Sequence, residues 1–204
     1  LMAGINAALT VQGKEPLVLK RSDGYIGVMI DDLVTKGTLE PYRLLTSRAE
    51  YRLILRHDNA DMRLSEIGHD IGLLSDERYQ AFINKQAAVE AEIARLKGIR
   101  LKPTAELQAF LAEKNSTQLR DGFLFADLLK RPELDYDSLY PFAPLEEPLS
   151  SDVTRQVEIQ IKYDGYINKA YSKVEKLKRL EEKRIPENID YDSINGIANE
   201  AKEK

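Results

Sequence analysis

The chain has 204 residues, of which 43% are hydrophobic, so it can bury a real core and disorder throughout is excluded. It has no cysteine, which excludes disulfides, thiolate zinc sites and cysteine nucleophiles. The formal net charge of -4 gives no overall attraction for nucleic acid, so any such contact must come from a local patch. No apolar run is long enough to cross a bilayer, and no signal peptide pattern opens the chain, so we expect a soluble, cytoplasmic protein.

The first residues predict helices separated by turns. The segment 1–9 is rich in Ala and Leu without a cap residue before it, so we expect a helix that begins upstream, in a longer protein. The chain also stops inside a helical pattern, so both ends look like cuts. A brief strand or extended loop is expected at 17–19. Asp23 can cap a helix over 25–35, whose apolar residues share one face, and Gly37 can end it.

The segment 41–56 mixes aromatic, apolar and arginine residues, and its spacing fits either a helix or a strand. That choice stays open at this point. The helix after it is clearer, because Asp58 or Asn59 can accept its first free amide hydrogens and Gly72 can end it.

A long helix is predicted from Ser75 to residue 97. Ser75 can cap it, and the acids Asp76 and Glu77 then lie at the positive end of the helix dipole. Gly98 follows as a stop. The helix carries a stripe at alternating steps of three and four residues, the spacing that pairing helices use. This stripe consists of Tyr79, Phe82, Gln86, Val89, Ile93 and Leu96.

The rest of the chain also predicts helices. Thr104 starts one that runs through 111, another covers 123–130, and three prolines make 141–148 a linker. Ser151 or Asp152 then caps the longest helix, which should reach about residue 184, and Pro186 precedes a last helix near residue 192. The lysine-rich second half of the long helix is interpreted as a solvated face. Its expected buried side is Val153, Val157, Ile161, Ile167, Val174, Leu177 and Leu180. The fold class is therefore mainly α, with at most a few short strands near the N-terminal end.

No complete catalytic site can be assembled from these residues. His57 and His69 have no metal-ligand spacing around them, so a surface or capping role is expected and no metal site. There is no phosphate loop or GxGxxG fingerprint, so a nucleotide cofactor would have to be held elsewhere. Asp31 and Asp32 are neighbours that point about 100° apart on a helix, and so would not converge on one substrate atom.

A cluster of arginines interleaved with tyrosines is the most informative feature. Guanidinium groups and aromatic rings grip phosphates and stack on unpaired bases. If the segment is helical, spacings of four place Arg48, Arg52 and Arg56 on one face. The alternative is that the arginines pair with Glu50, Asp58, Asp61 and Glu66 and only fasten one part of the fold to the next. The cluster consists of Arg43, Arg48, Arg52, Arg56 and Arg63, with Tyr42 and Tyr51.

Several long motifs carry a family resemblance. The chain contains MAGINAAL, EPYRLLTSRAEYRL, RHDNADMRL, QVEIQIKYDGYI and IPENIDYDSINGIANEAKEK. Together they closely resemble the tRNA uridine 5-carboxymethylaminomethyl modification enzymes, the glucose-inhibited division protein A family. The likeness covers essentially the whole chain and is loosest between about 99 and 149.

The resemblance implies a full-length enzyme that modifies C5 of the wobble uridine in tRNA. Such an enzyme uses FAD and NADH, takes a methylene group from folate, and acts as a homodimer with a tRNA-modification GTPase of the MnmE/TrmE type. In this family the FAD-binding fold lies before Leu1, so neither cofactor is expected on this chain and catalytic residues are not expected within it. The family also continues past Lys204 with a further helical tail.

The resemblance also suggests a division of labour. It assigns 1–57 to the end of the FAD-binding domain with the arginine-rich connection, 58–145 to a first helical subdomain, and 146–204 to a second. Docking of the tRNA anticodon loop is expected at the arginine cluster, or else its arginines face the flavin domain. A different reading is a helical protein-interaction domain without a direct RNA role. The candidates for binding the GTPase are Gln156, Gln160, Lys162, Tyr163 and Tyr166.

Overall fold

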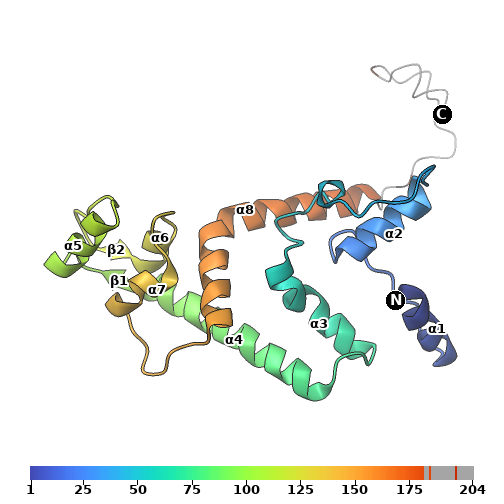
Figure 1. The fold of residues 1–204 in the computed structure, drawn as a ribbon, viewed down its shortest axis with the longest axis horizontal. Helices are drawn as coiled ribbons and strands as arrows, with labels where there is room; N and C mark the ends of the chain where they lie inside the picture. Colours follow the sequence, from blue (N-terminus) through green and yellow to red (C-terminus); the bar gives the residue numbers. More distant parts are fainter. Residues whose placement is uncertain (182–183, 185–195, 197–204) are drawn as a thin grey trace.

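The computed structural model describes residues 1–181, 184 and 196, and its described part is mainly α-helical (Figure 1). The expected stop at Pro186 and the helix near 192 lie outside the described residues. The mainly α fold class is confirmed. The α-helices are α1 (Met2–Val11), α2 (Tyr25–Thr35), α3 (Ala60–Asp70), α4 (Asp76–Gly98), α5 (Ala105–Glu113), α6 (Phe125–Leu129), α7 (Tyr136–Leu139) and α8 (Ser151–Glu181). Short 3-10 helices are η1 (Thr46–Arg48), η2 (His57–Asn59) and η3 (Tyr140–Phe142).

The two short strands of the described chain lie in its middle, not near its N-terminal end as expected. β1 (Arg100–Leu101) pairs antiparallel with β2 (Phe123–Leu124). The segment 17–19 is an extended loop, because no strand lies beside it and its backbone is held by a side chain of α1 instead. Asn6 donates to the carbonyl of Leu17 at 3.0 Å and accepts from its amide at 2.7 Å.

The larger core lies where α4, α6 and α8 pack together. Val89 and Leu96 of the predicted stripe are buried there, and Ile93 packs against them. The core joins residues from both predicted helical subdomains, whose boundary remains a prediction. Along α8 burial ends at Val174 in the described part, so the predicted buried side is too long. Leu177 and Leu180 are 39% and 63% exposed.

A smaller core holds α2 against the segment 41–56. It is formed by Val28, Ala49 and Leu55, with Tyr25 and Tyr51 packed on it. Apart from η1, the segment 41–56 is neither helix nor strand: it runs irregularly beside α2 and the second half of α8 (Figure 1). The arginines at 48, 52 and 56 therefore do not share a helical face.

The entry into α2 requires a glycine. A Cβ atom at Gly27 would lie 2.2 Å from the carbonyl oxygen of Lys20, a contact that no side chain can make. Helix α2 can therefore lie directly on the turn that precedes it. This turn carries Arg21, which is central to the site described below.

The predicted helix caps divide into two groups. Ser75 and Thr104 accept amide hydrogens at the starts of α4 and α5, as predicted. Asp23 does not cap α2, because Gly24 occupies the cap position and the Asp23 carboxylate accepts from the amide of Lys20. Asn59 occupies the cap position of α3 without capping it, because its side chain bonds to other groups.

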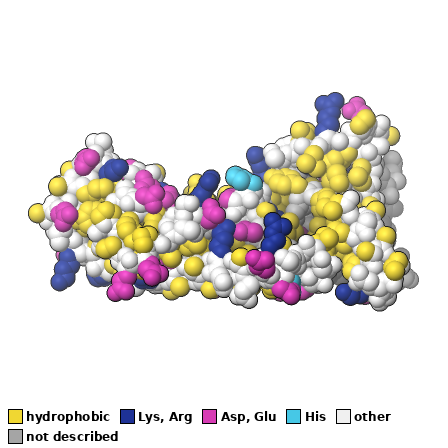
Figure 2. All heavy atoms as spheres, turned by 60° about the horizontal axis from the view of Figure 1, so that its bottom comes forward, with side chains coloured by type: hydrophobic (Ala, Val, Ile, Leu, Met, Phe, Trp, Pro, Cys, Tyr) yellow, Lys and Arg dark blue, Asp and Glu magenta, His cyan; other side chains and the backbone are white. Residues whose placement is uncertain are grey.

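The molecule is elongated, with α8 joining its two cores. Figure 1 shows α8 leaving α4, bending, and continuing toward α2. Gly165 lies near the middle of this helix, and a glycine is one of the few residues at which a helix bends sharply. Figure 2 shows hydrophobic side chains gathered at the end that carries α1 and α2. Within the described residues, no helix combines the length and apolar character needed to span a membrane.

Candidate nucleic-acid and partner interface

The predicted arginine cluster separates into an exposed and a partly buried group. Arg43, Arg48 and Arg52 are exposed on the segment 41–56. Arg56 and Arg63 are only partly accessible, and their donors are used inside the fold. The structure thus places three of the five predicted RNA-binding arginines where a ligand can reach them.

Arg48 is held in place by Tyr42. Its guanidinium carbon lies 4.6 Å from the centre of the Tyr42 ring, a cation–π contact. The Tyr42 hydroxyl donates to the Asp32 carboxylate at 2.8 Å. Burial, followed by this carboxylate, raises the pKa of Tyr42, so the hydroxyl stays a donor at neutral pH. Tyr42 therefore connects an exposed arginine to a buried acid.

Arg21, which the sequence did not single out, is the centre of the polar network under this surface. Its guanidinium lies 2.7 Å from the Asp32 carboxylate and 2.8 Å from that of Asp31, both on α2. It also lies 2.6 Å from the Glu50 carboxylate on the arginine-rich segment. A further bond reaches the carbonyl oxygen of Arg48 at 3.3 Å. One partly buried cation thereby joins the turn, α2 and the segment that displays the exposed arginines.

The Asp32 carboxylate is ionised within this network although it is only 3% exposed. Lys36, 2.9 Å away, makes the largest contribution to lowering its pKa, and Arg21 and Tyr42 add to that effect against the cost of burial. Burial alone would lower the pKa of Arg21, but bonds to Glu50, Asp32 and Asp31 outweigh it and raise that pKa. The network is thus a set of permanent charges rather than a proton donor and acceptor pair.

Arg56 and Arg63 belong to the fold. Arg56 forms an ion pair with Asp58 at 3.0 Å, one of the pairings that the alternative reading predicts. Arg63 donates to the side-chain oxygen of Asn59 at 3.1 Å and to the carbonyls of Arg56 and Asp23. Burial lowers the pKa of Arg63, as expected for a cation enclosed by the loop.

The other acids of that alternative have different partners. Glu50 pairs with Arg21, and Asp61 pairs with Lys85 of α4 at 2.8 Å. The alternative therefore accounts for Arg56 within the cluster, while Arg43, Arg48 and Arg52 show no ion pair among the described residues. These three arginines are the part of the cluster that remains available for a ligand.

The predicted partner-binding residues on α8 are also of two kinds. Tyr163 and Tyr166 are 46% and 63% exposed. Gln156 is only 3% exposed and donates to the carbonyl oxygen of Asp58 at 2.6 Å. Gln160 points to the sulfur of Met62, and Lys162 pairs with Glu158 at 2.9 Å while donating to the carbonyl of Leu134. Direct access from solvent is best at the two tyrosines.

Tyr163 borders a groove beside α7 and α8, which Tyr166 does not line. It has a volume of about 550 Å³ and is bordered by Tyr163, Lys162 and Arg155 of α8 and by Tyr136 of α7. The lining also includes Asp137 and Glu158, so the groove carries both signs of charge beside its aromatic rings. Residue spacing alone gives no sign of this groove, because its two sides come from different helices.

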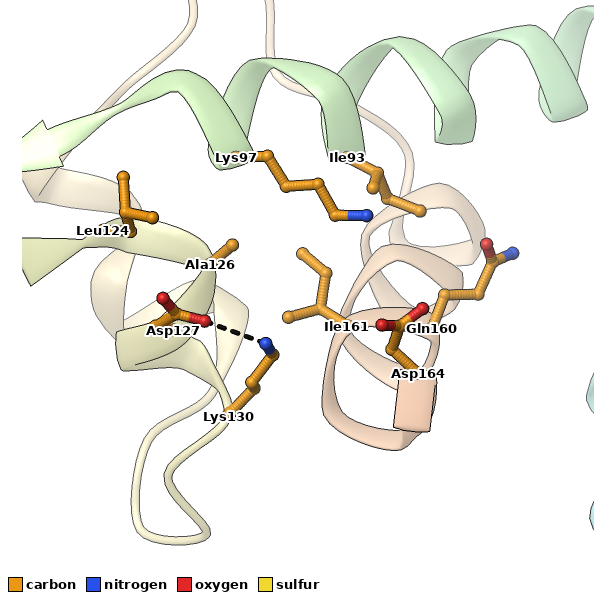
Figure 3. Close-up of a pocket in the computed structure, with 9 residues that line it drawn as sticks. All are labelled: Ile93, Lys97, Leu124, Ala126, Asp127, Lys130, Gln160, Ile161 and Asp164. Atoms are coloured by element: carbon orange, nitrogen blue, oxygen red, sulfur yellow. Dashed lines mark hydrogen bonds and ion pairs between the residues drawn. The ribbon is translucent and has the colours of Figure 1, made fainter. Parts of the chain in front are cut away.

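A second hollow lies between α4, α6 and α8 (Figure 3). Its volume is about 370 Å³, with Ile93 and Ile161 on its apolar side. Lys97 reaches into it, and Lys130 pairs with Asp127 at 2.8 Å. The sequence offered no signal for this cavity, because its residues come from three separated elements.

Neither histidine forms part of a metal site within the described residues, where no group of three or more His, Cys, Asp or Glu is placed to hold an ion. His69 lies 2.9 Å from the Asp76 carboxylate and stacks on Tyr79 with ring centres 4.1 Å apart. It fastens the turn between α3 and α4. His57 begins η2 at the surface.

Comparisons with known proteins agree with the fold. A model of the tRNA modifying enzyme MnmG/GidA C-terminal helical domain matches residues 76–171. The chain is 71% identical over 205 residues to the tRNA uridine 5-carboxymethylaminomethyl modification enzyme MnmG of Enterococcus faecalis, and 60% identical over 204 residues to that of Bacillus subtilis. Each match covers 100% of this chain and 32% of the relative.

A solved structure gives the same result in three dimensions. GidA of Aquifex aeolicus, in its form II crystal, superimposes with a TM-score of 0.74 at 42% identity. The match covers 98% of this chain and 31% of that one, so the chain spans about a third of the proteins that it matches. The chain therefore belongs to the MnmG/GidA family and matches the C-terminal portion of its members.

Proposed function

We propose that the chain serves as the docking portion of an enzyme that modifies C5 of the wobble uridine in tRNA. It holds the anticodon loop at the exposed arginines of the segment 41–56 and a partner GTPase at α8. The family membership supports the substrate class, because the relatives named above are tRNA uridine modification enzymes. We also propose that the whole protein is a cytoplasmic homodimer.

The redox cofactors of the proposed reaction are FAD and NADH, bound by the whole protein. A dinucleotide site needs a glycine-rich turn between a strand and a helix, which presents free amides to the pyrophosphate. The described residues contain one two-stranded sheet and no such turn after either strand, so they do not fit that group. The role of these helices is then to position RNA and partner for chemistry carried by other parts of the protein.

The RNA proposal rests mainly on the exposure of Arg43, Arg48 and Arg52. The segment that carries them is fixed by the polar network around Arg21 and Asp32. Guanidinium groups bind phosphate oxygens in pairs and stack on bases that are not paired, as in an anticodon loop. Because Arg21 and Tyr42 fix the segment from below, the arginines are displayed without a large loss of chain entropy on binding. Tyr51 contributes to the core beneath them.

Replacing Arg48 and Arg52 together with Gln should weaken binding of an anticodon stem-loop to the full-length protein. The expected loss is about tenfold or more at moderate salt, with a salt slope smaller by about 1 to 2, because each lost phosphate contact removes one released counterion. Fluorescence anisotropy over a range of salt concentrations measures both. Arg120→Gln, an exposed arginine between α5 and β2, is the matched control and should leave binding unchanged. Unchanged affinity in the double variant would favour a protein-interaction domain without an RNA role.

The GTPase proposal depends on Tyr163, which borders the α7–α8 groove, and on Tyr166, which is exposed three residues further along α8. Tyr163→Ala with Tyr166→Ala should weaken binding of the partner GTPase by about tenfold or more, because exposed aromatic residues next to a groove are frequent anchors of protein interfaces. Pull-down and calorimetry with the full-length protein measure this. Tyr171→Ala is the control, since Tyr171 is 50% exposed on the same helix but borders a different cavity, with Leu53 and Arg56. Equal binding by all variants would remove α8 from the partner interface.

A further inference from the structure

The second half of α8 packs through one face only. Ile167 and Tyr171 border a cavity with Leu53 and Arg56, and Val174 borders another with Tyr51. These three α8 residues follow one another at steps of four and three, so they form a single stripe along the helix. The packed stripe therefore faces the arginine-rich segment and the loop after it.

Two positions after each residue of the packed stripe, the sequence has a lysine. Two residues correspond to about 200° around an α-helix, so Lys169, Lys173 and Lys176 lie opposite the packed stripe. All three are exposed. They too follow steps of four and three, which places them in one row about 10 Å long. We call this row the basic stripe.

The acids of this part of α8 lie elsewhere on the helix. Asp164 borders the same cavity as Ile167, and Glu175 follows Tyr171 by four residues, so both carboxylates are on or beside the packed side. Between residues 166 and 176 the face of the basic stripe consequently holds no carboxylate. A merely solvated helix face usually alternates the two signs of charge, whereas this half-helix separates them.

We propose that the basic stripe binds the phosphate backbone of a base-paired RNA stem. This inference rests on the proposed function, because it adds a second contact for the same RNA. A nucleic-acid duplex carries one negative charge for about every 1.7 Å of its axis, so a row about 10 Å long faces several phosphates at once. Flexible ammonium groups without a bidentate fork suit backbone contacts that do not read sequence.

The position of the stripe fits a stem rather than a loop. The segment with Arg43, Arg48 and Arg52 lies beside the second half of α8 (Figure 1). Tyr51 of this segment and Val174 of α8 border the same cavity. The exposed arginines and the basic stripe thus lie at the same end of the molecule. Because the packed stripe faces the arginine-rich segment, the lysines lie on the other side of α8 from it. A stem-loop that contacts both surfaces must therefore pass over α8, with its unpaired bases on the arginines and its paired phosphates on the lysines.

The test is a triple substitution of Lys169, Lys173 and Lys176 with Gln in the full-length protein. Glutamine keeps a high helix propensity, so α8 should remain folded, which circular dichroism and the thermal midpoint check. An anticodon stem-loop should bind about tenfold or more weakly at low salt, with a salt slope smaller by about 2 to 3. A single-stranded loop RNA without the stem should lose much less.

A control variant carries the same change of charge at a distance. It replaces three exposed lysines near α4 and α6, namely Lys97, Lys102 and Lys130, and should bind the stem-loop like the wild type. An equal loss in both triple variants would mean that only net charge matters and would overturn the proposal. The proposal would also be overturned if the triple variant at Lys169, Lys173 and Lys176 lost only GTPase binding. The same holds if that variant bound RNA normally while the Arg48 and Arg52 double variant bound it more weakly. In this last case the proposed function still stands, whereas a wild type that binds no RNA defeats both.

Discussion

Replacing Arg21 with Met should destabilise the smaller core by about 3–5 kcal/mol, the usual cost when one partner of a buried ion pair is removed. The Arg21 side chain is 15% exposed and faces three carboxylates at 2.6–2.8 Å. Asp32, whose side chain is 4% exposed, would then be left with Lys36 and the Tyr42 hydroxyl as partners. Most of the cost should come from the loss of a cation beside this buried carboxylate, whose remaining cation Lys36 is largely exposed to solvent, rather than from lost packing.

Urea unfolding combined with amide hydrogen exchange on α2 measures this effect, because exchange reports the smaller core separately from the larger one. Lys36→Met is the matched control. It removes a cation 2.9 Å from the same Asp32 carboxylate, but the Lys36 side chain is 66% exposed, so the loss should stay near 0–1 kcal/mol. Similar losses in the two variants would contradict a central role for Arg21.

The helical part of this fold is readable from the sequence because its signals are local. Ser75 and Thr104 cap α4 and α5 by bonding to amides within the first turn of each helix. The stripe that contains Val89 and Leu96 identifies the buried side of α4. Asp23 failed as a cap because the amide of Lys20 competes for its carboxylate. A cap residue can satisfy either the helix or the turn before it, and the sequence does not say which.

The structure of the arginine-rich segment could not be predicted from its local sequence. Its spacing fits a helix or a strand, yet it forms neither, because its backbone is held by contacts with distant residues. Arg21 bonds to the carbonyl of Arg48, and Arg63 bonds to that of Arg56, while just after the segment Gln156 bonds to the carbonyl of Asp58, 98 residues away. Which arginines remain exposed depends on these tertiary contacts. The sequence therefore identified the cluster but could not separate Arg43, Arg48 and Arg52 from the two that build the fold.

Within the described residues, the larger core also contains an arginine–carboxylate centre of this kind. In the larger core Glu92, 3% exposed, accepts from Arg95 at 2.6 and 2.7 Å and from the Tyr136 hydroxyl at 2.7 Å. Burial, with the Glu92 carboxylate next, raises the pKa of Tyr136, and Glu92 raises that of Arg95. Arg95 also reaches the carbonyl of Ala143 at 3.1 Å, so this centre ties α4 to α7 and to the loop that leads into α8.

Replacing Arg95 with Met should cost about 3 kcal/mol or more, since it leaves the Glu92 carboxylate buried without a cation. Tyr136→Phe should cost only about 1–2 kcal/mol, because the carboxylate keeps Arg95 and loses one hydrogen bond. Chemical denaturation followed by circular dichroism measures both. Both variants remove a hydrogen-bond donor to the Glu92 carboxylate, but only Arg95→Met also removes its positive charge.

A double variant separates the buried charge from the lost contacts of Arg95. Changing Glu92 to Met in the Arg95→Met background removes the uncompensated carboxylate and fills its place with an apolar side chain of similar length. Apolar replacement of a whole buried pair is often neutral, so the double variant should regain a large part of the lost stability. If it is no more stable than Arg95→Met alone, the cost arises from the lost bond to Ala143 and the lost packing, and Glu92 is not the reason that Arg95 matters.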